Sequence, residues 1–101
     1  MKFLLSRQAE RALQQQWDYY FDRNGTRLAD RILAEIFDEI GRLIELPELG
    51  HFRPDLTDRP FRFYLVYNVF LIYDPKSSPL YIARVYHAAQ DIKTRMEKDE
   101  D

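Results

Sequence analysis

Residues 61–73 read Phe-Arg-Phe-Tyr-Leu-Val-Tyr-Asn-Val-Phe-Leu-Ile-Tyr, a run that is rich in aromatic and β-branched side chains. Such residues favour strands, because their side chains pack well on a pleated surface. The run is long for a single strand, and Asn68 near its middle is a residue type that tolerates the backbone of a tight turn. The stretch therefore predicts two antiparallel strands joined at Asn68.

Beyond this hairpin, the chain continues with a second turn and a third strand. Residues 74–79, Asp-Pro-Lys-Ser-Ser-Pro, have the composition of a turn, and residues 80–87 are again of strand type. We expect a short helix or an extension over residues 88–95. Residues 96–101 are mostly charged, so we expect a single domain over residues 1–95, followed by a frayed C-terminal tail over residues 96–101.

The N-terminal part of the chain predicts a short strand and a helix. Residues 3–5 are apolar, and Ser6 is a residue type that caps helix N-termini. Apolar residues then recur at the three- and four-residue spacing of one helical face. Asn24-Gly25 ends this helix, because both residue types tolerate the left-handed backbone of a last turn.

A second helix follows directly, with a wide apolar stripe of isoleucine and leucine. We expect Thr26 to cap its N-terminus and Pro47 and Gly50 to end it. Because the connection between the helices is so short, they must lie antiparallel, as a helical hairpin. Residues 51–60 contain two prolines and several charges, which predicts a polar loop.

Together these elements predict an α+β fold with an N-terminal strand, an antiparallel helical hairpin and a three-strand antiparallel meander. The apolar faces of the helices would cover one side of the sheet, giving two layers. The place of the first strand in the sheet stays open. The other face of the sheet has no covering element in this prediction, and it is where we expect function.

Composition narrows the functional classes. The 101 residues carry a net charge of −2 and no cysteine, which argues against strong direct nucleic-acid binding and excludes disulfides and thiolate metal sites. No apolar run is long enough for a membrane span or a signal peptide, so we expect a cytoplasmic protein without membrane contact. His51 and His87 lack a metal-ligand spacing, and no glycine-rich loop is present, so we expect neither a metal nor a cofactor.

One kind of chemistry stays open, the cleavage of RNA through its 2′-hydroxyl. That reaction needs a base, an acid and cations around the phosphorus. His87, Arg62, Arg84 and the loop pair Arg53 and Asp55 would serve if they met on one sheet face. The alternative interpretation is that these residues have no catalytic role, and that each arginine points to water or pairs with a carboxylate.

Charge is unevenly distributed along the chain. Residues 51–95 hold seven Lys and Arg against four Asp, whereas residues 1–50 and 96–101 are both acidic overall. The sheet half is therefore mildly basic, which fits a sheet face that meets an acidic partner. Exposed aromatic side chains flanked by arginine would resemble the centre of a protein interface.

The N-terminal strand and the two helices are followed by a series of short motifs. They are Leu46-Pro47-Glu48-Leu49-Gly50, Arg53-Pro54-Asp55-Leu56, Arg62-Phe63-Tyr64-Leu65-Val66, Tyr67-Asn68-Val69-Phe70-Leu71-Ile72-Tyr73 and the closing Arg84-Val85-Tyr86-His87-Ala88-Ala89-Gln90-Asp91. In this order, they resemble the RelE/ParE toxin superfamily, and its ParE-like branch more closely. The resemblance covers about residues 3–92.

The resemblance implies the toxin of a type II toxin–antitoxin system, of the kind linked to plasmid stabilisation. It would inhibit DNA gyrase without chemistry of its own, and a ParD-like antitoxin would neutralise it in a hetero-oligomer. The residues expected to contact the target are Arg53, Arg62, Arg84, His87 and Gln90.

The alternative within the superfamily is a RelE-like, ribosome-dependent mRNA endonuclease. Its catalytic residues here would be His87, Arg62, Arg84 and Asp55. RelE-like surfaces are typically rich in lysine and arginine, whereas residues 51–66 contain no lysine, only Arg53, Arg59 and Arg62. This departure favours the ParE-like branch.

Overall fold

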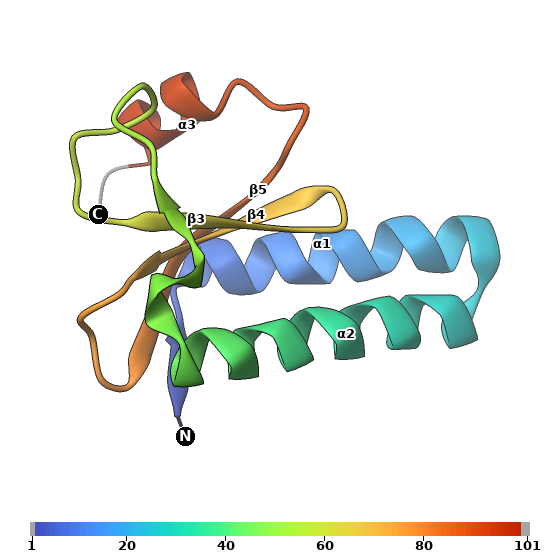
Figure 1. Cartoon of the computed structure of the whole chain (residues 1–101). Helices are drawn as coiled ribbons and strands as arrows, with labels where there is room; N and C mark the ends of the chain where they lie inside the picture. The colour runs from blue at the N-terminus through green and yellow to red at the C-terminus, as the bar shows by residue number, and fades with distance from the viewer. Residues whose placement is uncertain (1, 100–101) are drawn as a thin grey trace.

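A five-stranded sheet with the strand order β1-β5-β4-β3-β2 organises the chain (Figure 1). The computed structural model describes residues 2–99. The strands are β1 (Phe3–Leu5), β2 (His51–Phe52), β3 (Arg62–Val66), β4 (Val69–Asp74) and β5 (Leu80–His87). The predicted three-strand antiparallel meander is confirmed as β3, β4 and β5, and the predicted α+β class is also confirmed.

The structure shows where β1 lies in the sheet, which the sequence left open. It pairs in parallel with β5, with Phe3 opposite Leu80, and so forms one edge of the sheet. The prediction of an unpaired polar loop over residues 51–60 is wrong at its start, because His51 and Phe52 pair with β3 at the other edge. Two-residue strands leave no periodicity to detect in the sequence.

The predicted hairpin turn is confirmed, with β3 and β4 joined by Tyr67 and Asn68. Tyr67 has a φ of +54°, the left-handed region that ordinary residues avoid. Two-residue hairpin loops demand this backbone because it matches the twist of the flanking strands.

Two helices, α1 (Arg7–Asn24) and α2 (Thr26–Glu45), form the predicted hairpin. Ser6 caps α1, its Oγ accepting a hydrogen bond from the Ala9 N–H at 3.0 Å, and Gly25 ends α1 with a φ of +84°. The prediction that Thr26 caps α2 is wrong. Gly25 occupies the capping position of α2 without any side-chain hydrogen bond, since one glycine serves both helices in so short a connection.

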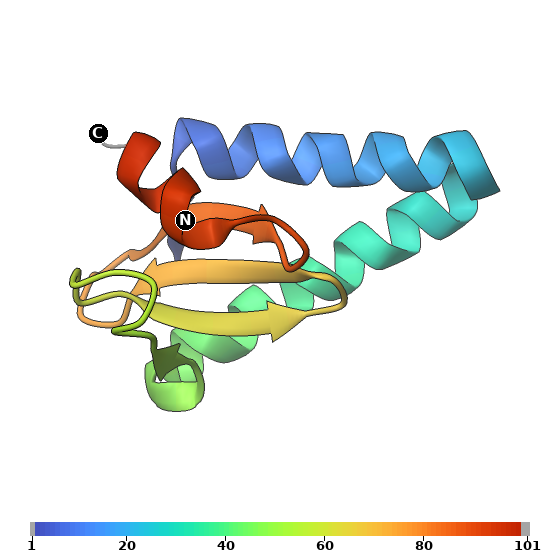
Figure 2. The ribbon, with the colours of Figure 1, turned by 90° about the horizontal axis from the view of Figure 1, so that it is seen from above.

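The hairpin covers one face of the sheet, and the larger core lies between them (Figures 1 and 2). It contains Ala9 and Leu13 of α1, Ile32, Ile36, Ile40 and Leu43 of α2, and Leu71, Tyr73, Ile82 and Val85 of the sheet. The short 3-10 helix η1 (Pro47–Leu49) connects α2 to β2.

The expectation that the other sheet face is uncovered is wrong. A short helix, α3 (Ile92–Lys98), lies over it, as Figure 2 shows from above. Ile92 and Met96 are buried against Phe63, Ile72 and Tyr86. Only two apolar residues, four apart, dock this helix, so its amphipathic signal in the sequence is weak.

The boundary expected after residue 95 falls inside α3, whose Met96 is 5% exposed. Residues 96–99 of the predicted tail are thus part of the described fold, whereas residues 100 and 101 lie outside the described residues.

Candidate functional site

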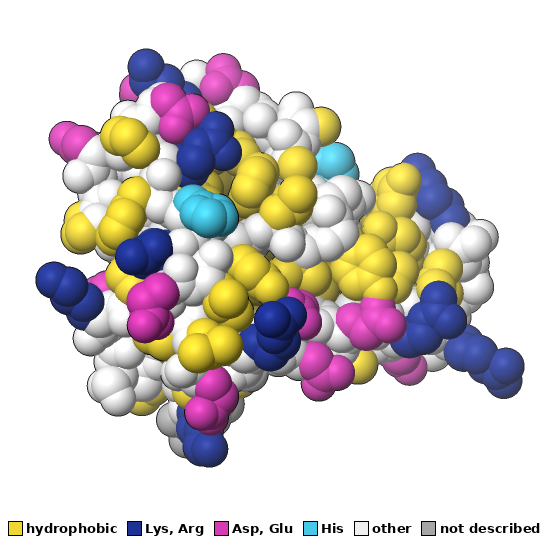
Figure 3. Space-filling view, in the orientation of Figure 1, with side chains coloured by type: hydrophobic (Ala, Val, Ile, Leu, Met, Phe, Trp, Pro, Cys, Tyr) yellow, Lys and Arg dark blue, Asp and Glu magenta, His cyan; other side chains and the backbone are white. Residues whose placement is uncertain are grey.

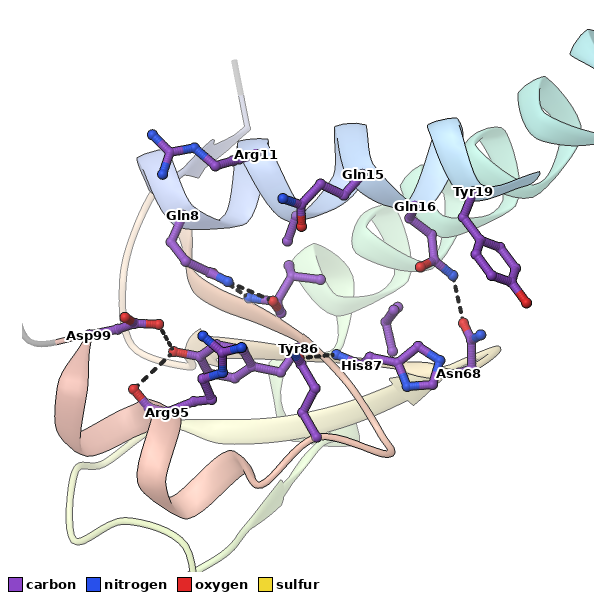
Figure 4. Close-up of a pocket in the computed structure, with 14 residues that line it drawn as sticks. Gln8, Arg11, Gln15, Gln16, Tyr19, Asn68, Tyr86, His87, Arg95 and Asp99 are labelled. Carbon is purple, nitrogen blue, oxygen red and sulfur yellow. Dashed lines mark hydrogen bonds between the residues drawn. The ribbon is translucent and has the colours of Figure 1, made fainter. Parts of the chain in front are cut away.

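A cleft of about 430 Å³ lies between α1, the end of β5 and α3, and we call it the α1–β5 cleft. Figure 4 shows side chains of α1 on one side of it and those of β5 and α3 on the other. The residues of α1 that line the cleft are Gln8, Arg11, Ala12, Gln15, Gln16 and Tyr19. The lining residues from the rest of the chain are Asn68, Val69, Val85, Tyr86, His87, Gln90, Arg95 and Asp99.

Two of the predicted site residues, His87 and Gln90, lie in this cleft. The His87 backbone N–H donates to Gln90 Oε1 at 2.9 Å, and the Gln90 N–H donates to the His87 carbonyl at 3.0 Å. The Ala89 N–H donates to His87 Nδ1 at 3.0 Å.

Hydrogen bonds across the cleft tie α1 to the sheet. Gln16 Nε2 donates to Asn68 Oδ1 at 2.6 Å, joining α1 to the β3–β4 turn (Figure 4). Arg11 and Arg95 also line the cleft, and among residues 2–99 neither forms an ion pair. They bring positive charge to a chain of net negative charge.

A second surface, which we call the sheet patch, consists of His51, Arg53, Leu65 and Phe70 and lies on the α3 side of the sheet. These residues line a shallow pocket of about 270 Å³. Leu65 and Phe70 are paired across β3 and β4, and Leu65 is 53% exposed. Hydrophobic side chains also reach the surface in the view of Figure 3.

Arg53 is paired within its own loop. Its Nε and Nη2 donate to Asp55 Oδ1 and Oδ2 at 3.0 and 2.8 Å, a bidentate ion pair. The hydrogen bonds from Arg53 hold the pKa of the Asp55 carboxyl below its usual range. Asp55 is therefore held as a hydrogen-bonded carboxylate, which makes it a poor general acid.

Arg62 faces the other side of the sheet. It is paired with Phe52, and its guanidinium carbon lies 4.2 Å from the centre of the Phe52 ring. Its Nη1 donates to the Gly50 carbonyl at 2.7 Å. The side chain thus fastens the connection between η1 and β2 to β3.

Arg84 is buried under α3, with 2% of its surface exposed. Its Nη1 donates to the Ala83 carbonyl at 2.7 Å and its Nη2 to the Asp99 carbonyl. Beside it, the Tyr86 hydroxyl donates to Asp99 Oδ2 at 2.7 Å. Arg84 and Tyr86 thereby hold the end of α3 on the sheet.

The four residues proposed for RNA cleavage are therefore in separate surroundings. His87 lines the α1–β5 cleft, Asp55 pairs with Arg53 in a loop, Arg62 faces the helical layer and Arg84 is buried beneath α3. Of the predicted site residues, the structure brings together two separate pairs, His87 with Gln90 and Arg53 with Asp55.

Sequence reasoning missed the residues that α1 contributes to the cleft, above all Gln8 and Arg11. From the helical repeat alone, a polar residue such as Gln8 is expected to face solvent. Nothing in a helical repeat indicates that it reaches β5, which comes 77 residues later.

Other site types find no support in the described part of the chain. Among residues 2–99, no group of three or more histidine or acidic side chains is placed to hold a metal ion. None of the helices in these residues combines the length and apolar character that crossing a membrane requires.

Comparison with known families places this fold. The family model described as "ParE toxin of type II toxin-antitoxin system, parDE" matches residues 3–92. The chain belongs to the ParE toxin family. It is thus a ParE-type toxin of a type II toxin–antitoxin system, and such a system also contains an antitoxin partner.

A solved structure agrees with the ParE fold. The structure described as the chromosomal ParDE TA system from P. aeruginosa has a TM-score of 0.69 and 20% identity, covering 86% of this chain and 95% of that chain. At this identity the similarity shows the fold alone. A comparison with curated proteins finds no significant match.

Proposed function

We propose that this ParE-family chain inhibits DNA gyrase and so blocks replication, and that a ParD-like antitoxin neutralises it. The observation that carries the proposal is the ParE family match over residues 3–92. Gyrase inhibition is what the ParE-like resemblance of the sequence implies, and it requires a binding surface rather than a catalytic site.

The geometry of the predicted catalytic residues supports inhibition by contact. General acid–base chemistry needs its groups within hydrogen-bonding reach of one substrate. Here Arg62 fastens its own backbone, Arg84 is buried, and Asp55 is engaged by Arg53. An endonuclease would have to rearrange three of its four groups.

The sheet patch is the surface that we propose for gyrase. Leu65 and Phe70 offer apolar area beside Arg53, and protein interfaces combine such an apolar centre with arginine. Arg53 can exchange its exposed partner Asp55 for a carboxylate of the target at little cost, because exposed ion pairs are weak. An antitoxin that covers the same patch would neutralise the toxin.

The test is a gyrase supercoiling and DNA-cleavage assay with purified protein, run beside an mRNA-cleavage assay on translating ribosomes. We expect inhibited supercoiling, trapped cleaved DNA and intact mRNA. Leu65→Ser should weaken gyrase inhibition about tenfold or more, the effect of removing an interface anchor. Leu4→Ser is the matched control, because Leu4 is 50% exposed at the opposite edge of the sheet.

Two results would contradict the proposal. If the parent protein cleaves mRNA and His87→Ala lowers the cleavage rate by about 10²- to 10⁴-fold, the protein acts by acid–base catalysis instead. Equal gyrase inhibition by the parent, Leu65→Ser and Leu4→Ser proteins would remove the sheet patch from the mechanism. Thermal unfolding of each variant establishes that it is folded.

A further inference from the structure

Among residues 2–99, no strand pairs with the edge of β5 that faces the α1–β5 cleft beyond its first three residues. β1 pairs only with residues 80–82, whereas β5 continues to His87. A register shift places Ala83 as an extra residue between Ile82, which pairs with Tyr73, and Arg84, which pairs with Ile72. After this bulge, Val85 and His87, which both line the cleft, turn their polar backbone groups away from β4.

Side chains from α1 and its cap satisfy this edge. Ser6 Oγ donates to the Ala83 carbonyl at 2.6 Å. Gln8 Nε2 donates to the Val85 carbonyl at 2.8 Å, and the Val85 N–H donates to Gln8 Oε1 at 2.9 Å (Figure 4). The Gln8 amide thus makes both hydrogen bonds of Val85 that a neighbouring strand would make.

The last residue of β5 is satisfied in the same way. The Gln90 side chain accepts from the His87 N–H, and the Gln90 backbone N–H donates to the His87 carbonyl. Unpaired strand edges attract other chains, so proteins usually cover them. Here the cover at Val85 is one amide on a side chain, which can rotate away.

The walls of the α1–β5 cleft indicate the charge of an occupant. Arg11 and Arg95 line it and have no ion pair among residues 2–99. Asp99 is the acidic residue that lines the cleft, and its carboxylate is one negative charge against the two positive charges of Arg11 and Arg95. The cleft therefore favours an anionic occupant.

We propose that the α1–β5 cleft is an acceptor site for an extended, acidic peptide segment, which adds to β5 where β1 ends. The peptide backbone takes over both hydrogen bonds of Val85 from the Gln8 side chain, and that of the His87 N–H from the Gln90 side chain. Its acidic side chains reach Arg11 and Arg95. The volume of about 430 Å³ falls within the ordinary range of ligand sites.

A peptide fits this edge better than a nucleotide does. Val85 presents a donor and an acceptor side by side, and a peptide group matches both. Phosphate oxygens only accept hydrogen bonds, so a nucleotide phosphate would leave the carbonyl without a partner. The exchange of a side-chain amide for a backbone amide is close to balanced, because one amide hydrogen bond replaces another.

This inference does not depend on gyrase inhibition, and its test reads peptide binding directly. The probe is a fluorescein-labelled hexapeptide, Glu-Val-Glu-Val-Glu-Val, titrated with purified protein and followed by fluorescence anisotropy. Lys-Val-Lys-Val-Lys-Val tests the charge, and a uridine dinucleotide tests the nucleotide alternative. In a ¹⁵N-labelled protein, the amide signals of Val85 and His87 locate the bound peptide.

Variants separate the backbone contact from the charge contact. Gln8→Ala removes the competing amide and should tighten acidic-peptide binding about tenfold, from two hydrogen bonds of modest net value. Gln14→Ala is the matched control, because Gln14 lies on the exposed side of α1, where its side chain donates a hydrogen bond to Asp18 of the same helix. Arg11→Glu should weaken binding about fivefold, whereas Arg31→Glu on α2 should not.

The proposal is supported if the acidic peptide binds, shifts the Val85 and His87 amides and responds to Gln8→Ala and Arg11→Glu as stated. It is overturned if the acidic peptide does not bind at millimolar concentration, if the basic peptide binds equally well, or if the dinucleotide shifts these amides more strongly. Unchanged affinity in a folded Gln8→Ala protein would also overturn it. None of these outcomes depends on the gyrase assay.

Discussion

Gly50 has no side chain because the Tyr73 hydroxyl occupies the space that a side chain would need. The Gly50 N–H donates to that hydroxyl at 2.9 Å, and the hydroxyl donates to the Pro47 carbonyl at 2.6 Å. A Cβ at position 50 would lie 2.7 Å from the hydroxyl oxygen and 3.0 Å from the Phe63 carbonyl. The residue that the sequence marked as a helix stop thus also joins η1 to the sheet.

Substitution by alanine should therefore have opposite effects at Gly50, where a side chain would meet Tyr73, and at Gly41, where no atom is near. Gly50→Ala should lower the free energy of unfolding by about 1–3 kcal/mol, because its methyl group overpacks a buried site. Gly41→Ala should raise it by about 0.5–1 kcal/mol, since position 41 is inside α2 with open space around it. Urea unfolding measures both, and equal effects of the two substitutions would contradict the packing at Gly50.

Tyr86 gives the fold a dependence on alkaline pH. Burial, reinforced by the hydrogen bond to Asp99, raises the pKa of the Tyr86 hydroxyl above its ordinary value. Above about pH 10 the phenol ionises in the unfolded chain but stays protonated in the folded one, so the unfolded state binds fewer protons and stability falls as pH rises.

We expect the free energy of unfolding of the parent protein to decline above about pH 10, and Tyr86→Phe to decline less steeply. Urea unfolding at several pH values measures the two slopes. Burial also raises the pKa of Tyr73, so part of the decline in the free energy of unfolding remains in the Tyr86→Phe variant. Identical slopes in the parent and Tyr86→Phe proteins would contradict the assignment.

At the scale of the elements, α3 closes the second core although it has only seven residues. So short a helix is marginal by itself and depends on its contacts with the sheet. Ile92 and Met96 supply these contacts, and Asp91 caps the helix, its Oδ1 accepting from the Thr94 N–H. The described part of the predicted tail is therefore held by burial rather than by charge.

Loss of one apolar contact should consequently loosen α3. Met96→Ala should lower the free energy of unfolding by about 2–3 kcal/mol, because a buried methionine is truncated. Lys93→Ala, an exposed change in the same helix, should alter it by less than about 0.5 kcal/mol. Urea unfolding compares the two, and a Met96→Ala effect as small as the Lys93→Ala effect would show that α3 is not docked.

At the scale of the whole molecule, the helical hairpin reaches beyond the sheet, as Figure 2 shows. Near its tip, Tyr19 and Phe21 are 45% and 43% exposed, whereas Ile36 and Ile40, farther along α2, are fully buried. The tip is held by contacts within the hairpin, among them the hydrogen bond that Trp17 Nε1 on α1 donates to Asp30 Oδ1 on α2 at 2.8 Å. The two ends of the hairpin should therefore differ in local stability.

Hydrogen exchange should reveal this difference. We expect the amides of residues 17–30 to exchange faster than those of β4 and β5, because local opening of the tip exposes little of the main core. Mass spectrometry of peptic fragments after timed exchange makes the comparison. Protection of the tip equal to that of β4 would mean that the hairpin opens only with the whole fold.

The sequence by itself determined the elements whose signals are local. Helical spacing, the Ser6 cap, the stop at Gly25 and the hairpin turn at Asn68 each depend on residues a few positions apart, and all four are confirmed. The order of these elements was also enough for the resemblance to the ParE family, which the family match confirms.

Only the tertiary structure decided the rest, because it depends on contacts between distant residues. The parallel pairing of β1 with β5, the cover that α3 provides and the burial of Arg84 all leave no periodic signal in the chain. The clearest case is Gln8, which meets Val85 across 77 positions of sequence. A glutamine on a helix is polar in either surrounding, so only the packing of α1 beside β5 makes it the partner of a strand edge.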